Sequence, residues 1–128
     1  MSVDYIDPSE LYALLESKPG SVSVVDVRDE DRDGYISSSI HFPSRGFSES
    51  SWKDLGSKVT TPIVVFHCMF SQVRGPKAAR MFLPYASPSV EKVLILRGGW
   101  IGFYMNVASQ MPAAQKLCTI PPNYVPQF

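Results

Sequence analysis

The sequence predicts one α/β domain in which helices flank a mostly parallel sheet. Three short runs, Val22–Val27, Ile63–Phe66 and Val93–Leu96, are apolar and rich in β-branched residues, as strands buried on both faces are. Helix-like segments alternate with these runs, an order typical of α/β domains. The length of 128 residues fits one domain. We therefore expect residues 1–128 to form a single domain, with an irregular, proline-rich tail over about 111–128.

The first element should be a helix that begins beside Asp7. Asp7 suits the N-cap, Pro8 suits the first helical position, and Glu10 is placed to complete a capping box. The helix should end near Lys18, because a proline and a glycine follow it directly. The strand predicted over Val22–Val27 comes next.

The later elements follow from composition and periodicity. Segment 37–58 is rich in serine and glycine and weakly periodic, which predicts loops with one short helix around Trp52. Small and apolar residues at helical spacing predict helices over 75–85 and 99–110. The tail after Met111 holds four prolines and has no clear pattern, so we expect it to wrap the surface or to be partly mobile.

The composition argues against several kinds of partner. Twelve basic residues balance twelve acidic ones, so no strong field draws the chain to nucleic acid or to an anionic membrane. The N-terminus lacks the pattern of a signal peptide, and no apolar stretch reaches membrane-spanning length. We therefore expect a soluble, monomeric protein of the cytoplasm, with the nucleus as a second location.

One of the two cysteines lies in a pattern that indicates chemistry. Cys68 and Cys118 are too few for a disulfide framework and lack the spacing of a metal site, so we expect no metal. Cys68 follows the predicted strand Ile63–Phe66 closely, five residues separate it from Arg74, and a helix should begin there. A loop of this length can turn its backbone N–H groups inward, and the helix N-terminus adds its positive dipole end. Such a cradle binds an oxyanion and favours a thiolate at Cys68.

The neighbours of Cys68 have separate parts in this chemistry. The Arg74 guanidinium can form two parallel hydrogen bonds with a phosphate-like group and keeps its charge. Gly75 allows close backbone approach, and His67 is expected to fix the loop by hydrogen bonds rather than to act as an acid or base. Cys68 alone would be interpreted as an inert core thiol, but with Arg74 it is predicted to be the nucleophile. We expect Cys68 and Arg74 to be catalytic and to be joined in substrate binding by Met69, Phe70, Ser71, Gln72 and Val73.

The motif His67-Cys68-x-x-Ser71-x-x-Arg74-Gly75-Pro76 resembles the active-site loop of a known family. That family comprises the rhodanese-fold phosphatases of the M-phase-inducer type and the related eukaryotic arsenate reductases. The resemblance extends over most of the chain. Val24–Arg28 is similar to the early Asp-x-Arg strand of the family, and Leu96–Trp100 to its late Gly-Gly turn. The tail after Met111 is not covered.

The resemblance implies a rhodanese-like fold and a covalent thiophosphate or thioarsenate intermediate on Cys68. It implies that residues 69–74 bind the anion and that Asp26 and Arg28 are supporting residues, ion-paired beneath the site. Sulfurtransferases of this fold typically have a loop one residue shorter, which suits sulfane sulfur, whereas the longer loop here suits a tetrahedral anion. We expect specificity to come from rim residues near Phe70, Trp100 and Phe103.

The loop departs from this family in its acidic residues. The cell-cycle phosphatases carry acidic side chains within the loop, whereas Met69 and Val73 occupy those positions here. Gly75 also replaces the serine or threonine that follows the arginine in ordinary tyrosine phosphatases. A proton for the leaving group must therefore come from the substrate or from acids elsewhere. The candidates lie in segment 29–33, which we expect to be a solvated loop, and are Asp29, Glu30, Asp31 and Asp33.

Two activities fit this pattern. We expect a protein-tyrosine or dual-specificity phosphatase that acts on aryl or protein phosphate esters and needs no cofactor. The alternative is an arsenate reductase that uses the same Cys68 with glutathione and glutaredoxin as reductant. The substrate is then a phosphorylated protein or a small oxyanion. A thiosulfate sulfurtransferase and a non-catalytic binding module are the remaining alternatives, and Cys118 is either a packed thiol or a resolving partner of Cys68.

Overall fold

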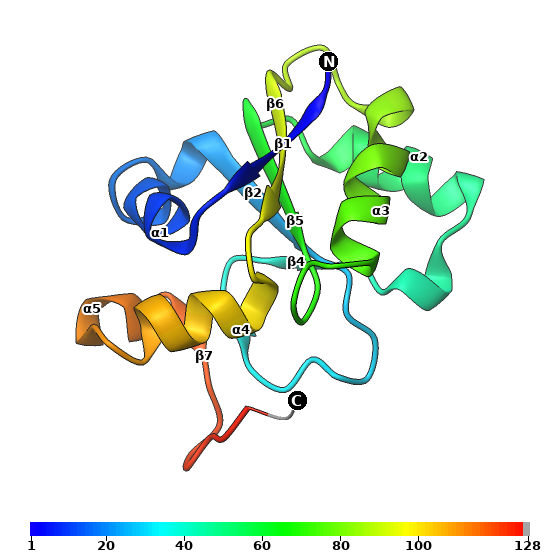
Figure 1. The fold of residues 1–128 in the computed structure, drawn as a ribbon. Coiled ribbons are helices and arrows are strands. Elements are labelled where there is room, and N and C mark those ends of the chain that lie inside the picture. The colour runs from blue at the N-terminus through cyan, green and yellow to red at the C-terminus, as the bar shows by residue number, and fades with distance from the viewer. Residues whose placement is uncertain (127–128) are drawn as a thin grey trace.

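The computed structural model describes residues 1–126, which form a parallel sheet with helices on both faces (Figure 1). The central sheet has the order β1-β6-β5-β2-β4, and all of its strand pairs are parallel. The strands are β1 (Val3–Ile6), β2 (Val22–Asp26), β4 (Ile40–His41), β5 (Ile63–His67) and β6 (Lys92–Leu96). A separate antiparallel pair joins β3 (Tyr35–Ile36) to β7 (Cys118–Thr119). The predicted α/β class with a mostly parallel sheet is confirmed.

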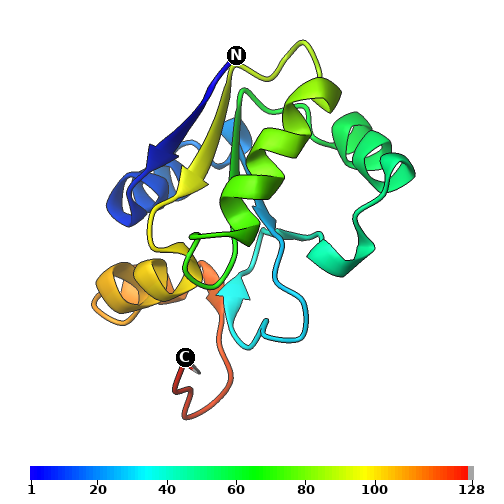
Figure 2. The same cartoon turned by 45° about the vertical axis from the view of Figure 1, so that its right-hand side comes forward.

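The helices divide between the two faces of the sheet (Figures 1 and 2). One face is covered by α1 (Pro8–Ser17), by α4 (Gly99–Phe103) with its π-helical extension Tyr104–Ala108, and by α5 (Pro112–Gln115). The other face is covered by α2 (Glu49–Lys58) and α3 (Arg74–Phe82). Each face has its own buried apolar cluster, so burial of the strands on both sides holds the layers together.

The elements that were predicted from the sequence lie close to their expected bounds. The Asp7 backbone N–H donates to Glu10 Oε1 at 3.0 Å, and α1 begins at Pro8 as expected. The three predicted strands are β2, β5 and β6, and the short helix expected around Trp52 is α2. The helix predicted over 99–110 is instead a short α4 that continues as the π-helical segment.

Two parts of the chain differ from expectation. β1 was not predicted, because its four residues, Val3–Ile6, form no continuous apolar run and include the polar Asp4. It is an edge strand of the central sheet and is paired only with β6. The tail after Met111 holds α5 and β7, whose pairing with β3 ties it to the domain. Residues 127–128 of that tail lie outside the described residues. No helix among residues 1–126 is long and apolar enough to span a membrane.

Candidate active site

Three loops meet at the carboxyl edge of the sheet, where parallel α/β folds place their binding sites. They follow β2, β5 and β6, which are neighbours in the sheet. The loop after β5 runs from Cys68 to α3. The loop after β2 contacts it through Arg28 and Asp31, and the turn after β6 contacts it through Trp100. The sheet topology thus brings the predicted site residues together.

The loop after β5 curls around the Cys68 thiol. The Cys68 backbone N–H donates to Ser71 Oγ at 3.4 Å, and Ser71 has the left-handed φ of 56° that lets the chain turn back. The Gly75 backbone N–H, in the first turn of α3, donates to Cys68 Sγ at 3.3 Å. A Cβ at Gly75 would lie 3.3 Å from the Cys68 nitrogen, so glycine keeps this approach open. The sulfur therefore lies at the positive end of α3, within hydrogen-bond reach of its backbone.

The turn after β6 fixes the same loop from the opposite side. The backbone N–H groups of Trp100 and Ile101 donate to the carbonyl oxygens of Cys68 and Met69, each at 3.0 Å. Gly99 has a φ of +60°, and a Cβ there would lie 2.6 Å from both carbonyl oxygens. Only glycine allows this contact. The sequence showed the Gly-Gly pair as a family resemblance but gave no sign that Gly99 contacts the Cys68 loop.

A buried ion pair lies beneath the loop, as the resemblance implied. Asp26 and Arg28 are both fully buried, and Arg28 Nη2 lies 2.8 Å from Asp26 Oδ2. Arg28 Nη2 also donates to the Gly34 carbonyl at 2.6 Å, and its guanidinium lies over the Trp100 ring at 5.4 Å. Arg28 Nη1 approaches Met69 Sδ at 4.0 Å. The ion pair thus connects β2 to the loop after β5 and to the turn after β6.

His67 is fully buried at the end of β5. Its Nδ1 atom lies 3.0 Å from the Cys68 carbonyl oxygen, so Nδ1 carries the proton and donates it. Burial lowers the pKa of His67, which keeps the imidazole neutral at physiological pH. Among the described residues, Nε2 has no hydrogen-bond partner. This geometry agrees with a loop-fixing part for His67.

Arg74 lies at the mouth of the loop and is held by acids of the loop after β2. Its Nη1 and Nη2 atoms donate to the two carboxylate oxygens of Asp31 at 2.9 and 2.6 Å. Asp29 Oδ2 lies 3.6 Å from Nη1. The hydrogen bonds with Asp31 raise the pKa of Arg74 and lower that of Asp31, so both groups are charged. Sequence reasoning gave no sign of this pair.

The expectation that segment 29–33 is a solvated loop is wrong. Asp29 accepts hydrogen bonds from Ser44 Oγ and from the Arg45 backbone N–H. Asp33 accepts a hydrogen bond from the Tyr124 hydroxyl at 2.9 Å. Of the four acids, only the Glu30 side chain, 78% exposed, extends into solvent. The other three are fixed by partners that are distant in sequence.

The rim of the site also differs from expectation. Phe70 and Val73 are 40% and 71% exposed, and Gln72 is exposed as well. Trp100 and Phe103 are fully buried, so neither forms the rim that we expected from them. Trp100 instead belongs to the core beneath the site, because its ring packs against Arg28.

The tail contributes one residue that sequence reasoning missed. The Trp100 indole Nε1–H donates to the Tyr124 hydroxyl at 2.8 Å, and that hydroxyl donates to Asp33. Burial raises the pKa of Tyr124 to about 12, so the phenol keeps its proton. Tyr124 thus connects the tail to the loop after β2 and to the turn after β6.

Cys118 lies apart from this chemistry. It is partly buried in β7 and forms no disulfide with Cys68. Burial raises the pKa of the Cys118 thiol to about 12, so it is a thiol rather than a thiolate at neutral pH. These features favour a packed thiol over a resolving partner.

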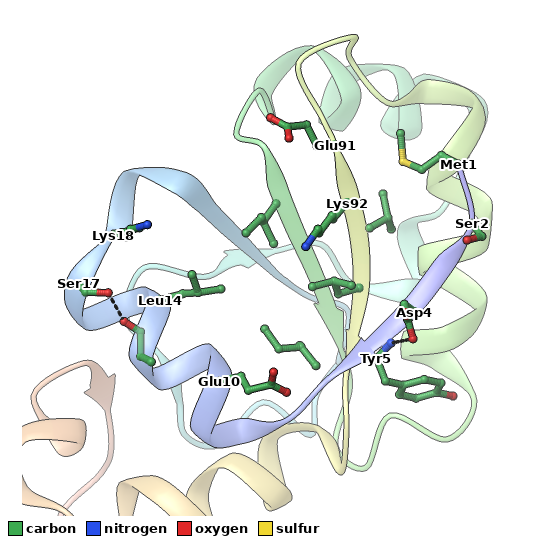
Figure 3. Close-up of a pocket in the computed structure, with 15 residues that line it drawn as sticks. Met1, Ser2, Asp4, Tyr5, Glu10, Leu14, Ser17, Lys18, Glu91 and Lys92 are labelled. Atoms are coloured by element: carbon green, nitrogen blue, oxygen red, sulfur yellow. Dashed lines mark hydrogen bonds between the residues drawn. The ribbon is translucent and has the colours of Figure 1, made fainter.

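One hollow of the surface is not lined by Cys68. It has a volume of about 770 Å³ and lies between α1 and the strands β1 and β6 (Figure 3). Tyr5, Leu14 and Lys92 are among its lining residues, and none of the predicted site residues lines it. Among residues 1–126 no group of three or more histidine, cysteine, aspartate or glutamate side chains is arranged to hold a metal ion.

Comparison with known proteins gives two groups of relatives. Residues 7–106 match the rhodanese-like domain family. Arsenate reductase 2.1 of Oryza sativa subsp. japonica is 36% identical over 112 residues, which are 82% of this chain and 69% of that protein. Dual specificity phosphatase Cdc25 of Arabidopsis thaliana is 33% identical over 109 residues, 80% of this chain and 73% of that protein. The structure of the As-Sb reductase from Leishmania major has a TM-score of 0.82 and 31% identity, over 98% of this chain and 91% of that one.

Proposed function

The chain belongs to the rhodanese-like domain family, and we propose that it is a cysteine-dependent phosphatase that acts on aryl or protein phosphate esters through a phosphocysteine intermediate. One observation carries the proposal. Cys68 Sγ accepts the Gly75 backbone N–H inside a loop that ends at Arg74, so nucleophile, helix N-terminus and guanidinium lie together. The similarity to the Arabidopsis phosphatase supports this function.

The reaction would proceed in two displacements at phosphorus. The Cys68 thiolate attacks, a sulfur–phosphorus bond forms, and the bond to the leaving oxygen breaks. Arg74 and the backbone N–H groups of the loop over 69–74 stabilise the charge on the equatorial oxygens. Water then attacks the phosphocysteine, which releases phosphate and restores the thiolate.

Protonation of the leaving oxygen is the weak step of this site. Met69 and Val73 offer no proton, and the hydrogen bonds from Arg74 lower the pKa of Asp31, which keeps its carboxylate ionised. His67 is buried and neutral, and its one bonded nitrogen donates to the Cys68 carbonyl rather than toward the loop mouth. We therefore propose that the proton comes from the substrate, so that esters with good leaving groups are preferred.

Arsenate reduction at the same site is the second candidate function. The similarity to the rice and Leishmania reductases favours it. The Cys68 thiolate would displace water from protonated arsenate to form a thioarsenate. A glutathione thiolate would then attack Cys68 Sγ, so that both electrons of the sulfur–arsenic bond stay with arsenic and arsenite leaves. The resulting mixed disulfide would be reduced by glutaredoxin.

One panel of assays separates these functions. Wild type and Cys68→Ser would be given an aryl phosphate, a phosphotyrosine peptide, arsenate with glutathione and glutaredoxin, and thiosulfate with cyanide. We expect turnover of the aryl phosphate and of arsenate by wild type, and loss of both in Cys68→Ser, because a serine hydroxyl is too weakly ionised to replace the thiolate.

Three outcomes would contradict the proposal. Retention of about a tenth of the activity by Cys68→Ser would mean that Cys68 is not the nucleophile. Turnover of thiosulfate alone would indicate a sulfurtransferase. Binding of a phosphopeptide without turnover of any substrate would indicate a binding module.

A further inference from the structure

The Nη1–Nη2 edge of Arg74 is already occupied, which bears on the oxyanion that the site accepts. Each oxygen of the Asp31 carboxylate accepts one hydrogen bond from this edge, at 2.9 and 2.6 Å. This is the bidentate arrangement in which an arginine binds a phosphate-like group. An incoming oxyanion must therefore either replace the Asp31 carboxylate or share Arg74 with it.

The contacts of Asp31 favour sharing over replacement. Its Oδ1 atom also accepts the Asp29 backbone N–H at 3.0 Å. Its carbonyl oxygen accepts the Asp33 backbone N–H at 3.1 Å and lies 3.5 Å from Arg28 Nη1. Asp31 is thus fixed by its own segment as well as by Arg74. A carboxylate held in this way stays beside Arg74 while a ligand binds the guanidinium.

The charges around this pair disfavour a ligand without protons. When Cys68 is a thiolate, the three anionic groups of Cys68, Asp29 and Asp31 surround the single guanidinium of Arg74. The other arginines near the segment, Arg28, Arg32 and Arg45, are paired with carboxylates outside this group, which are Asp26, Asp33 and Glu30. Each further negative charge on the ligand therefore adds repulsion that no nearby cation offsets.

We propose that Asp31 selects oxyanions that still carry a proton. The inference rests on the proposed oxyanion chemistry of Cys68 and Arg74 and adds the protonation state of the ligand. A hydroxyl of the ligand donates a hydrogen bond to the Asp31 carboxylate while charged oxygens of the ligand bind Arg74. A phosphate-ester monoanion or hydrogen arsenate can make that bond. Sulfate cannot, because it has only lone pairs to place against the carboxylate.

Inorganic phosphate and sulfate test this inference, because they have nearly the same shape and only phosphate keeps a proton near neutral pH. Their dissociation constants would be measured by titration calorimetry at about pH 6 and about pH 8, on either side of the range in which phosphate loses a proton. Wild type should bind phosphate more tightly at the lower pH and should bind sulfate about tenfold more weakly than phosphate there. Asp31→Asn should remove about tenfold of this preference by binding sulfate more tightly, because its amide can donate to a deprotonated oxygen.

Glu30→Gln is the matched control. Glu30 carries the same charge in the same segment, but it pairs with Arg45 and is 78% exposed. This variant should keep the wild-type preference, and thermal unfolding would show that both variants fold. An equal gain for both anions in Asp31→Asn would mean that the carboxylate only competes for Arg74, and an equal shift in Glu30→Gln would mean a general charge effect. Either result overturns the inference, whereas absence of binding of both anions to wild type would overturn the proposed function as well.

Discussion

Replacement of Gly99 by alanine tests how the Cys68 loop is held in its binding conformation. Gly99 has a φ of +60°, and a Cβ there would lie 2.6 Å from the carbonyl oxygens of both Cys68 and Met69. These are the oxygens that accept the Trp100 and Ile101 backbone N–H groups. The alanine methyl must therefore separate the turn after β6 from the loop after β5.

The expected loss of stability follows from two contributions. An alanine in the left-handed region costs about 1–2 kcal/mol. Loss of the two backbone hydrogen bonds adds about 1 kcal/mol each, so Gly99→Ala should lower the free energy of unfolding by about 3–4 kcal/mol. Gly98 is a matched control, because its φ is +76° and the nearest atom to its Cβ would be the Gly102 Cα at 3.1 Å, not the Cys68 loop. Gly98→Ala should cost only about 1–2 kcal/mol.

Denaturant unfolding and aryl phosphate hydrolysis would measure the two effects. We expect the kcat/KM of Gly99→Ala to fall about a hundredfold under conditions where the variant is folded, since a displaced loop no longer orients its nucleophile. Gly98→Ala should keep most of the wild-type activity. If the two variants are equally stable and equally active, contact between Gly99 and the loop does not hold the site in place, and the reasoning is refuted.

Three further predictions follow from the geometry. Hydrolysis should depend steeply on leaving-group pKa, with aryl phosphates much faster than phosphoserine, and a flat dependence with rate-limiting chemistry would reveal an acid that the structure does not show. Iodoacetamide should label Cys68 faster than the more exposed Cys118, and phosphate should protect Cys68; equal rates without protection would mean that no thiolate cradle forms. Burial lowers the pKa of His67. As pH falls below about 6.5, the His67 imidazole therefore binds a proton in the unfolded chain but stays neutral in the folded chain. The free energy of unfolding should then fall by up to about 1.4 kcal/mol per pH unit, and an unchanged slope in His67→Gln would contradict this.

The sequence was sufficient to predict the features that depend on neighbours along the chain. The start of α1 at Pro8, the strands β2, β5 and β6, and the loop from Cys68 to Arg74 all follow from local pattern. A helix that begins at the end of the Cys68 loop is such a feature, because the N-terminus of the helix directs its positive dipole end at that loop. The Cys68–Arg74 loop could therefore be predicted because all of its residues are adjacent in the sequence.

The features that were missed depend on residues that are far apart in the sequence. Asp31 and Arg74 are separated by 43 positions, and they meet because β2 and β5 are neighbours in the sheet. Tyr124 reaches Asp33 across 91 positions through the pairing of β7 with β3. A cluster of acids in one segment has the composition of a solvated loop, and only the sheet order shows which basic groups lie opposite it.

The ion pair between Asp31 and Arg74 also explains why both groups of relatives fit one site. An ionised Asp31 cannot donate a proton to an alkoxide, so hydrolysis of unactivated phosphate esters is penalised. Arsenate bears no such penalty, because the group that leaves it is water formed from its own hydroxyls. An aryl phosphate escapes the penalty by another route, since its leaving oxygen is a weak base and needs little protonation as it departs. The substrates that this geometry favours are therefore oxyanions that supply their own leaving group, and the second reactant, water or a thiol, decides between hydrolysis and reduction.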